Sequence, residues 1–106
     1  MSFEDLDKIE SKELVPGFFG KFIHSDNMTI AYWKIKAGST APVHKHVHEQ
    51  IAIVIEGEFE FILDKETKLL TPGTSVIIPS NVQHGGTAKT DCYLIDIFHP
   101  VREDFK

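Results

Sequence analysis

Residues 38–57 read Gly38-Ser-Thr-Ala-Pro-Val-His44-Lys-His46-Val-His48-Glu49-Gln50-Ile-Ala-Ile-Val-Ile-Glu56-Gly57, and this stretch decides the fold. It places three of the chain's six histidines within five positions. The apolar run 51–55 follows directly, and such a run predicts a central strand that is covered on both faces. A tight reversal at 56–58 ends it. The stretch therefore predicts an interior strand that is preceded by a group of possible ligands.

Short strands separated by turns are predicted along most of the remaining chain. They cover residues 18–24, 28–36, 58–63, 67–70, 75–78 and 91–98. Phe59, Phe61 and Leu63 alternate with other residues, which indicates a strand with one wetter face. No segment after residue 17 has helical periodicity. This pattern is typical of an all-β, single-domain antiparallel sandwich or small barrel.

The first 17 residues differ from the rest and are predicted to form an N-terminal arm, with the barrel spanning 18–106. Ser2, followed by Asp5 three residues later, is expected to cap a short helix with apolar residues at positions 3, 6 and 9. Pro16-Gly17 is expected to close that helix.

Composition narrows the class of protein. A chain of 106 residues, 42% hydrophobic and 25% charged, suits one globular domain. Eleven basic against sixteen acidic residues give a net charge of −5, so a nucleic-acid partner is not expected. Cys92 is the single cysteine, which suits a reducing compartment. No stretch resembles a secretory signal or a membrane span, and we expect a cytoplasmic protein without a membrane partner.

The histidines predict a metal site. His44 and His46 are two residues apart, so in a strand they point to the same side, and Gln50 keeps that parity if the strand continues. A further donor is expected from His84, which follows the turn 79–81 and is predicted to lie on a neighbouring strand. Imidazoles and a side-chain oxygen in this arrangement suit a first-row divalent metal.

The other candidates near this group receive weaker assignments. His48 is expected at the rim of the site, and His24 and His99 are expected to be surface or hydrogen-bonded residues. Glu49 competes with Gln50 as the oxygen ligand, but its odd parity points it away from His44 and His46. A structural or surface histidine cluster remains the alternative to a metal site.

Two spacings in the chain resemble the motifs of the cupin family. The first motif has its places at Gly38, His44, His46, Gln50 and Gly57, and the second at Gly73, Pro79 and His84. The chain departs from the pattern at Asn81, where the second motif has Gly, and at Gln50, where most cupins have Glu. The resemblance covers residues 18–99 and implies a cupin-type jelly roll around a metal.

Gln50 changes the expected chemistry. Three neutral imidazoles and a neutral amide leave the whole charge on a divalent cation, which makes it a stronger Lewis acid and a better host for an anion. The set also lacks the two-histidine, one-carboxylate triad of non-haem iron oxygenases. Non-redox chemistry is therefore favoured. Zn, Ni, Mn and Fe all accept this ligand set.

A narrower resemblance links the chain to the pectin-degradation cupins of the KdgF type. It is carried by the run from His44 to Ile51, by residues 56–61 and by the ending 96–105. The resemblance implies a metal-dependent enzyme that opens 4,5-unsaturated uronates to linear keto-sugar acids. It implies metal ligands at His44, His46, Gln50 and His84, and catalytic residues at Asp96, Phe98 and Arg102.

The residues themselves permit these roles and others. Asp96 and Phe98 are two residues apart on one strand, so both face the cavity if one does. Asp96 could shuttle a proton, and Arg102 could hold a carboxylate of the substrate. Asp96 could equally be a buried structural carboxylate, Phe98 a core residue and Arg102 a surface charge. One of Tyr32 and Trp33 must face inward.

Two other functions stay open: a small metal-dependent oxygenase, and a cupin that binds a sugar or acid without turnover. The expected partners are an anionic sugar and a second copy of the chain. The apolar faces of 18–23 and 59–63 are the surfaces expected to join a homodimer.

Overall fold

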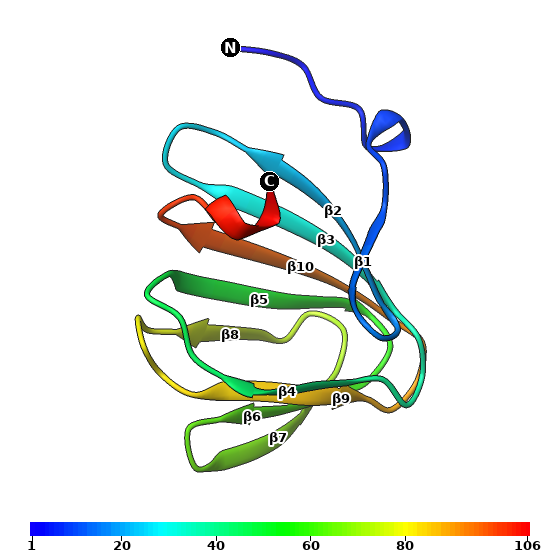
Figure 1. The fold of residues 1–106 in the computed structure, drawn as a ribbon. Helices are drawn as coiled ribbons and strands as arrows, with labels where there is room; N and C mark the ends of the chain where they lie inside the picture. The colour runs from blue at the N-terminus through cyan, green and yellow to red at the C-terminus, as the bar shows by residue number, and fades with distance from the viewer.

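The computed structural model describes residues 1–106 as two antiparallel β-sheets that face each other (Figure 1). The six-stranded sheet has the order β1 (Lys12–Val15), β2 (Phe18–His24), β3 (Thr29–Ile35), β10 (Cys92–His99), β5 (Glu49–Glu56) and β8 (Ser75–Ile78). The four-stranded sheet has the order β4 (Thr40–His44), β9 (His84–Ala88), β6 (Phe59–Leu63) and β7 (Glu66–Leu70). Two 3₁₀ turns, η1 (Leu6–Lys8) and η2 (Glu103–Phe105), complete the chain. The all-β prediction is confirmed. Neither helical turn has the length and hydropathy that crossing a bilayer would need.

Aromatic side chains fill the space between the sheets. Phe18 of the six-stranded sheet contacts Phe59 of the four-stranded sheet edge to face, with ring centroids 6.4 Å apart. Trp33 also contacts Phe18 edge to face, with ring centroids 6.1 Å apart. All three are buried, and burying rings of this size supplies a large share of the hydrophobic stabilisation.

Gly20 makes room for the indole of Trp33. The two residues are cross-strand partners in β2 and β3. A Cβ at Gly20 would lie 2.8 Å from Cζ3 of Trp33 and 2.6 Å from Cζ of Phe22. The indole can therefore lie against the backbone of β2 only because residue 20 has no side chain.

The N-terminal segment departs from the expected helix. Residues 12–15 form β1, which pairs antiparallel with β2 through a turn in which Gly17 has φ +83°. The helical part is only the turn η1, and its cap is Asp5, whose side chain accepts a hydrogen bond from the backbone N–H of Asp7. Ser2 donates instead to Glu4. Pro16-Gly17 closes a β-hairpin because the glycine adopts the positive φ that such turns need.

The apolar strand at 51–55 was predicted to be covered on both faces, and that prediction is wrong. β5 is an interior strand of its sheet, between β10 and β8, and its inward residues Ala52 and Val54 are buried. Its outward residues Ile51 and Ile55 are 39% and 41% exposed. An unbroken apolar run does not say whether a second layer covers the outer face.

Candidate functional site

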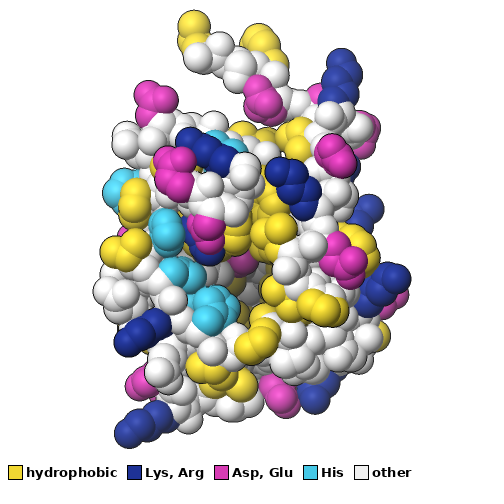
Figure 2. All heavy atoms as spheres, in the orientation of Figure 1, with side chains coloured by type: hydrophobic (Ala, Val, Ile, Leu, Met, Phe, Trp, Pro, Cys, Tyr) yellow, Lys and Arg dark blue, Asp and Glu magenta, His cyan; other side chains and the backbone are white.

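A cavity of about 320 Å³ lies between the two sheets. Figure 2 shows it as a hollow with histidine side chains on one rim and hydrophobic side chains on the other. Its polar lining gathers in one part and consists of His44, His46, Gln50, His84, Asp96 and Arg102. The apolar lining consists of Leu14, Val15, Phe18, Trp33, Ile35, Ala41, Pro42, Phe59, Phe61, Leu94, Phe98 and Phe105. The cavity therefore has a polar part and an apolar wall.

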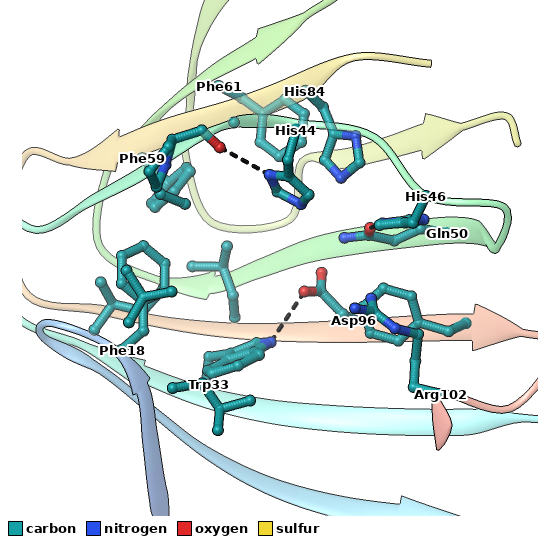
Figure 3. A pocket seen from close by; sticks show the side chains of 18 of the residues that line it. Phe18, Trp33, His44, His46, Gln50, Phe59, Phe61, His84, Asp96 and Arg102 are labelled. Carbon is teal, nitrogen blue, oxygen red and sulfur yellow. Dashed lines mark hydrogen bonds between the residues drawn. The ribbon is translucent and has the colours of Figure 1, made fainter. Parts of the chain in front are cut away.

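The three predicted histidine ligands converge (Figure 3). His44 ends β4 and His84 begins β9, and the two are cross-strand partners. His46 lies in the connection that follows β4, and its backbone carbonyl accepts a hydrogen bond from the N–H of Asn81 at 2.8 Å. The candidate ligand atoms of the three residues all lie within 4.8 Å of one another. Together they can hold a metal ion.

Backbone carbonyls fix the same tautomer in all three rings. Nδ1 of His44 donates to the carbonyl of Pro42 at 2.8 Å, and Nδ1 of His84 donates to that of Val82 at 2.9 Å. Nδ1 of His46 donates to the carbonyl of His48 at 2.9 Å. With Nδ1 protonated, each neutral ring presents its Nε2 lone pair to the cavity, as a metal ligand must.

Burial keeps the rings of His46 and His84 neutral. Burial, together with the nearby rings of His44 and His46, lowers the pKa of His84 to about 4, although its hydrogen bond to the carbonyl of Val82 acts in the opposite direction. Burial also lowers the pKa of His46, with a smaller contribution from the Arg102 charge. Neutral imidazoles at pH 7 do not have to lose a proton before they bind a cation.

Gln50 completes the donor set. Its Oε1 lies 3.0 Å from Nε2 of His46, which is the separation of neighbouring ligands at about 2.1 Å from one metal. Because the proton of His46 is on Nδ1, Nε2 of His46 and Oε1 of Gln50 face each other as two hydrogen-bond acceptors. Nε2 of His84 is buried and has no hydrogen-bond partner. Converging acceptors without a donor fit a cation.

The chain brings His44, His46 and Gln50 together in a different way from the one that strand parity suggested. β4 ends at His44, residues 45–48 cross to the opposite sheet, and β5 begins at Glu49. His44, His46 and Gln50 therefore do not share one strand face, and the condition for Gln50 to keep the parity of the two histidines, a continuing strand, is not met. They meet because the chain changes sheets between them, which side-chain spacing does not report.

Asp96 lies on β10 opposite the histidines, and its two carboxylate oxygens have different surroundings. Its Oδ2 accepts a hydrogen bond from the indole Nε1–H of Trp33 at 3.0 Å, while Oδ1 is buried without a partner (Figure 3). Burial raises the pKa of Asp96 to about 6, although Gln50, Trp33 and Arg102 act in the opposite direction. A carboxyl with this pKa can both give and take a proton near neutrality.

Arg102 is held rigidly rather than lying on the surface. It is 8% exposed, and its Nε and Nη2 donate to the two carboxylate oxygens of Asp104 at 3.0 and 2.8 Å. Its guanidinium lies over the rings of Phe105 and Phe98, at 3.9 and 4.6 Å from their centroids. One edge of the guanidinium is thus occupied by Asp104, and Arg102 is also one of the residues that line the cavity.

The remaining candidates also have definite places. Phe98 is buried and lines the cavity, so it is both core residue and wall. His48 is half-buried beside Phe98, with ring centroids 6.4 Å apart, and does not line the cavity. Glu49 points outward, as its parity predicted. His99 is exposed at the end of β10, and Nδ1 of His24 forms a hydrogen bond with the hydroxyl of Thr29.

Sequence reasoning missed three partners of the site. The indole N–H of Trp33 donates a hydrogen bond to Asp96, and the carboxylate of Asp104 accepts a hydrogen bond from the guanidinium of Arg102. The ring of Phe61 stacks on that of His84, with 7° between the planes. The alternation of β3 indicated only that Trp33 or Tyr32 faces inward. The register between strands decides the rest, and no local pattern in the sequence reports it.

Comparisons with known proteins agree with this geometry. The family model described as "Cupin domain" matches residues 31–98. Over 102 residues the chain is 33% identical to the pectin degradation protein KdgF of Dickeya dadantii, covering 93% of each protein. The structure of KdgF from a Halomonas species superposes with a TM-score of 0.93 at 30% identity, covering 100% of this chain and 99% of that one. An RmlC-like cupin from Shewanella frigidimarina superposes at 0.95 with 32% identity, covering 100% and 96%.

Proposed function

Since the chain belongs to the cupin family, we propose that it is a metal-dependent, non-redox enzyme that opens 4,5-unsaturated uronates to linear keto-sugar acids. The observation that carries the proposal is the meeting of an uncharged donor set with the buried carboxyl of Asp96 in one cavity. The similarity to proteins named KdgF supports the substrate class.

His44, His46, His84 and Gln50 would hold the divalent ion. When bound, the ion would supply Lewis acidity toward oxygen atoms of the uronate. These four ligands carry no negative charge, so they would leave the site attractive to a carboxylate. Arg102 would add a second positive charge at the cavity wall, and its bond to Asp104 fixes the direction of its remaining N–H groups.

Asp96 would move the proton that the reaction needs. The ring opens when the bond between C1 and the ring oxygen breaks and the C1 hydroxyl becomes an aldehyde. The hydroxyl loses a proton, and C4 gains one as the enol becomes a ketone, so the reaction is an isomerisation without an oxidant. Oδ1 of Asp96 is the free oxygen that could accept and return that proton, while Trp33 holds Oδ2.

The test follows the absorbance of the ring double bond of an unsaturated uronate, with and without enzyme, against its spontaneous loss. We expect metal-loaded protein to accelerate the loss and Asp96→Asn to abolish most of that acceleration. Asp26→Asn, at an exposed turn position, is the matched control and should behave like the parent protein. A protein that binds the uronate and leaves it unchanged would instead be a binding cupin. Iron-dependent oxygen consumption would indicate an oxygenase.

A further inference from the structure

The guanidinium of Arg102 is carried by a short C-terminal segment rather than by a strand. Arg102 is the single arginine of the chain, and it lies between the end of β10 and the turn η2 (Figure 1). The last residues of a chain are poorly ordered unless contacts tie them down. The position of the guanidinium in the cavity wall therefore depends on what ties residues 102–106 to the sheets.

The backbone of Arg102 is tied to a buried hydroxyl group. Its N–H donates to Oγ1 of Thr29 at 2.8 Å, in a buried hydrogen bond between residues 73 positions apart. Thr29 begins β3 and is 0% exposed. It pairs with His24 of β2 on one side and with Phe98 of β10 on the other. Thr29 thus joins the C-terminal segment to an interior strand of the six-stranded sheet.

A second partner fixes the direction of the Thr29 hydroxyl. Nδ1 of His24 lies 2.8 Å from the same Oγ1. Burial and the nearby charge of Lys106 lower the pKa of His24, so its ring is neutral at pH 7. A hydroxyl can donate its one proton to a neutral imidazole and still accept from a backbone N–H. The hydroxyl is therefore held on both sides, and turning away from Arg102 would cost it a partner.

An aromatic ring ties down the other end of the segment. Phe105 packs against Phe22 and Phe98, with ring centroids 4.8 and 5.6 Å apart. The guanidinium of Arg102 lies over the ring of Phe105, 3.9 Å from its centroid. The ring supports the plane of the guanidinium, while the hydrogen bond at the backbone fixes where the side chain begins.

We propose that Thr29 is a positioning residue for Arg102, whose hydroxyl places the guanidinium where it meets the carboxylate of the uronate. The inference rests on the proposed function, in which the positive charge of Arg102 attracts that carboxylate. Thr29 is not one of the residues that line the cavity, so it acts through Arg102 rather than on the substrate. A displacement of about 1 Å at a distance from the chemistry can cost on the order of a hundredfold in rate.

Thr29→Val is the variant that separates positioning from packing. It keeps the shape of the side chain but leaves the buried N–H of Arg102 without an acceptor, so the segment has to move to find water. Thr29→Ser keeps the hydroxyl and loses only a methyl group, so it should restore the parent behaviour. Thr67→Val makes the same chemical change at an exposed position of β7 and is the matched control.

The first measurement follows the guanidinium without any substrate. Because the chain has one arginine, its Nε–H gives a single guanidinium signal in a proton–nitrogen correlation spectrum. We expect exchange of this proton with water to become about tenfold or more faster in Thr29→Val, as the loss of one hydrogen bond implies. Thr29→Ser and Thr67→Val should match the parent.

His24→Phe provides a second variant at a half-buried position, in case Thr29→Val does not fold. It removes the other partner of the hydroxyl and should speed the exchange by a smaller factor. Circular dichroism checks the fold of each variant. Unchanged exchange in the folded Thr29→Val protein, or in His24→Phe where that protein does not fold, would overturn the proposal, whether or not the chain acts on uronates.

The second measurement is steady-state kinetics of metal-loaded protein on an unsaturated uronate. Thr29→Val should raise KM about tenfold or more and leave kcat within about threefold, because a carboxylate contact is made in the ground state and the transition state alike. Arg102→Gln should also raise KM. Adding Thr29→Val to it should raise KM no further, because the two residues act as one unit.

The outcomes separate this inference from the proposed function. An unchanged KM in Thr29→Val, or a full further increase in the double variant, contradicts the positioning role while the enzyme activity stands. A parent protein that binds the uronate without converting it contradicts the proposed function alone, and its dissociation constant then takes the place of KM with the same expected increase. A parent protein that neither binds nor converts the uronate overturns both.

Discussion

Asp96 is a buried carboxyl group, and its ionisation should cost the folded protein stability. Burial raises its pKa from 3.8 to about 6, so the folded state holds this proton more tightly than the unfolded state. The cost is absent below the unfolded pKa, grows as the pH rises from about 4 to 6 and is complete above the folded pKa. Near pH 7.5 the cost amounts to about 3 kcal/mol, which follows from the difference between the unfolded and folded pKa values of Asp96.

We therefore expect Asp96→Asn to stabilise the metal-free protein near pH 7.5 by up to about 3 kcal/mol while it removes activity. Near pH 3.5 the two proteins should be equally stable. Urea unfolding of chelator-treated protein at the two pH values measures both differences. A stabilisation of the same size at both pH values would contradict the buried, ionised carboxylate.

Trp33 positions the Asp96 carboxyl through one hydrogen bond. Trp33→Phe keeps an aromatic ring but removes the N–H, so the carboxyl loses its fixed orientation. We expect kcat to fall about tenfold with KM within about twofold, because one hydrogen bond to a charged group contributes about 1.5 kcal/mol or more. Steady-state kinetics on the unsaturated uronate measure both constants.

Tyr32→Phe is the matched control, since Tyr32 alternates with Trp33 and lies on the outer face. It also loses one polar group and should change neither constant. Equal losses in the two variants would mean that Trp33 acts through packing alone.

Residue chemistry was the part of the site that the sequence predicted well. His44, His46 and His84 were selected because three imidazoles at these spacings suit a metal, and the structure brings them together. The partners that tune the site were not predictable in the same way. The bond from Trp33 to Asp96 joins residues 63 positions apart, and only the pairing of β3 with β10 places them together.

At the scale of the strands, turn residues predicted where several strands end, but they did not show where the chain crosses from one sheet to the other. The strands at 18–24 and 75–78 have the predicted limits because Ser25-Asp26-Asn27 and Pro79 stop them. The four-residue crossing between β4 and β5 was not visible, because its residues carry no glycine or proline. β1 was missed because four residues of mixed polarity give too short a pattern.

Gly20 allows a prediction at this scale. In Gly20→Ala the new methyl group would meet the indole of Trp33 at less than 3 Å, and either the ring or β2 must move. We expect a loss of about 1–3 kcal/mol in the free energy of unfolding, as for other overpacked cores, together with reduced kcat.

Thr67→Ala, at an exposed position of β7, is the control and should lie within about 0.5 kcal/mol of the parent protein. Denaturant unfolding followed through the fluorescence of Trp33, the single tryptophan, measures both variants. An unchanged midpoint for Gly20→Ala would show that the strand yields without cost.

At the scale of the whole molecule, the ligands tie both sheets together. His44 and His84 belong to the four-stranded sheet and Gln50 to the six-stranded sheet. A bound metal would thus stabilise the folded state as a whole. At a free-metal concentration of about 100 Kd the gain is about 2.7 kcal/mol, or roughly 10 °C or more in Tm for a chain of this length.

We expect a chelator to lower Tm by about that amount and added divalent metal to restore it. In His84→Ala, metal and chelator should have almost no effect on Tm. Differential scanning calorimetry at fixed protein concentration measures the four cases. A metal-dependent Tm that persists in His84→Ala would place the ion elsewhere.

β10 carries two separate requirements on one short strand. Its even-numbered residues Asp96 and Phe98 line the cavity, and its odd-numbered residues Ile95 and Ile97 lie on the outer face. A deletion of one residue before Ile95 would exchange the two sets, burying isoleucines beside the imidazoles and exposing the carboxyl to solvent. Length changes here should therefore be tolerated far less than point substitutions, and a deep insertion-and-deletion scan of the strand would make that asymmetry visible.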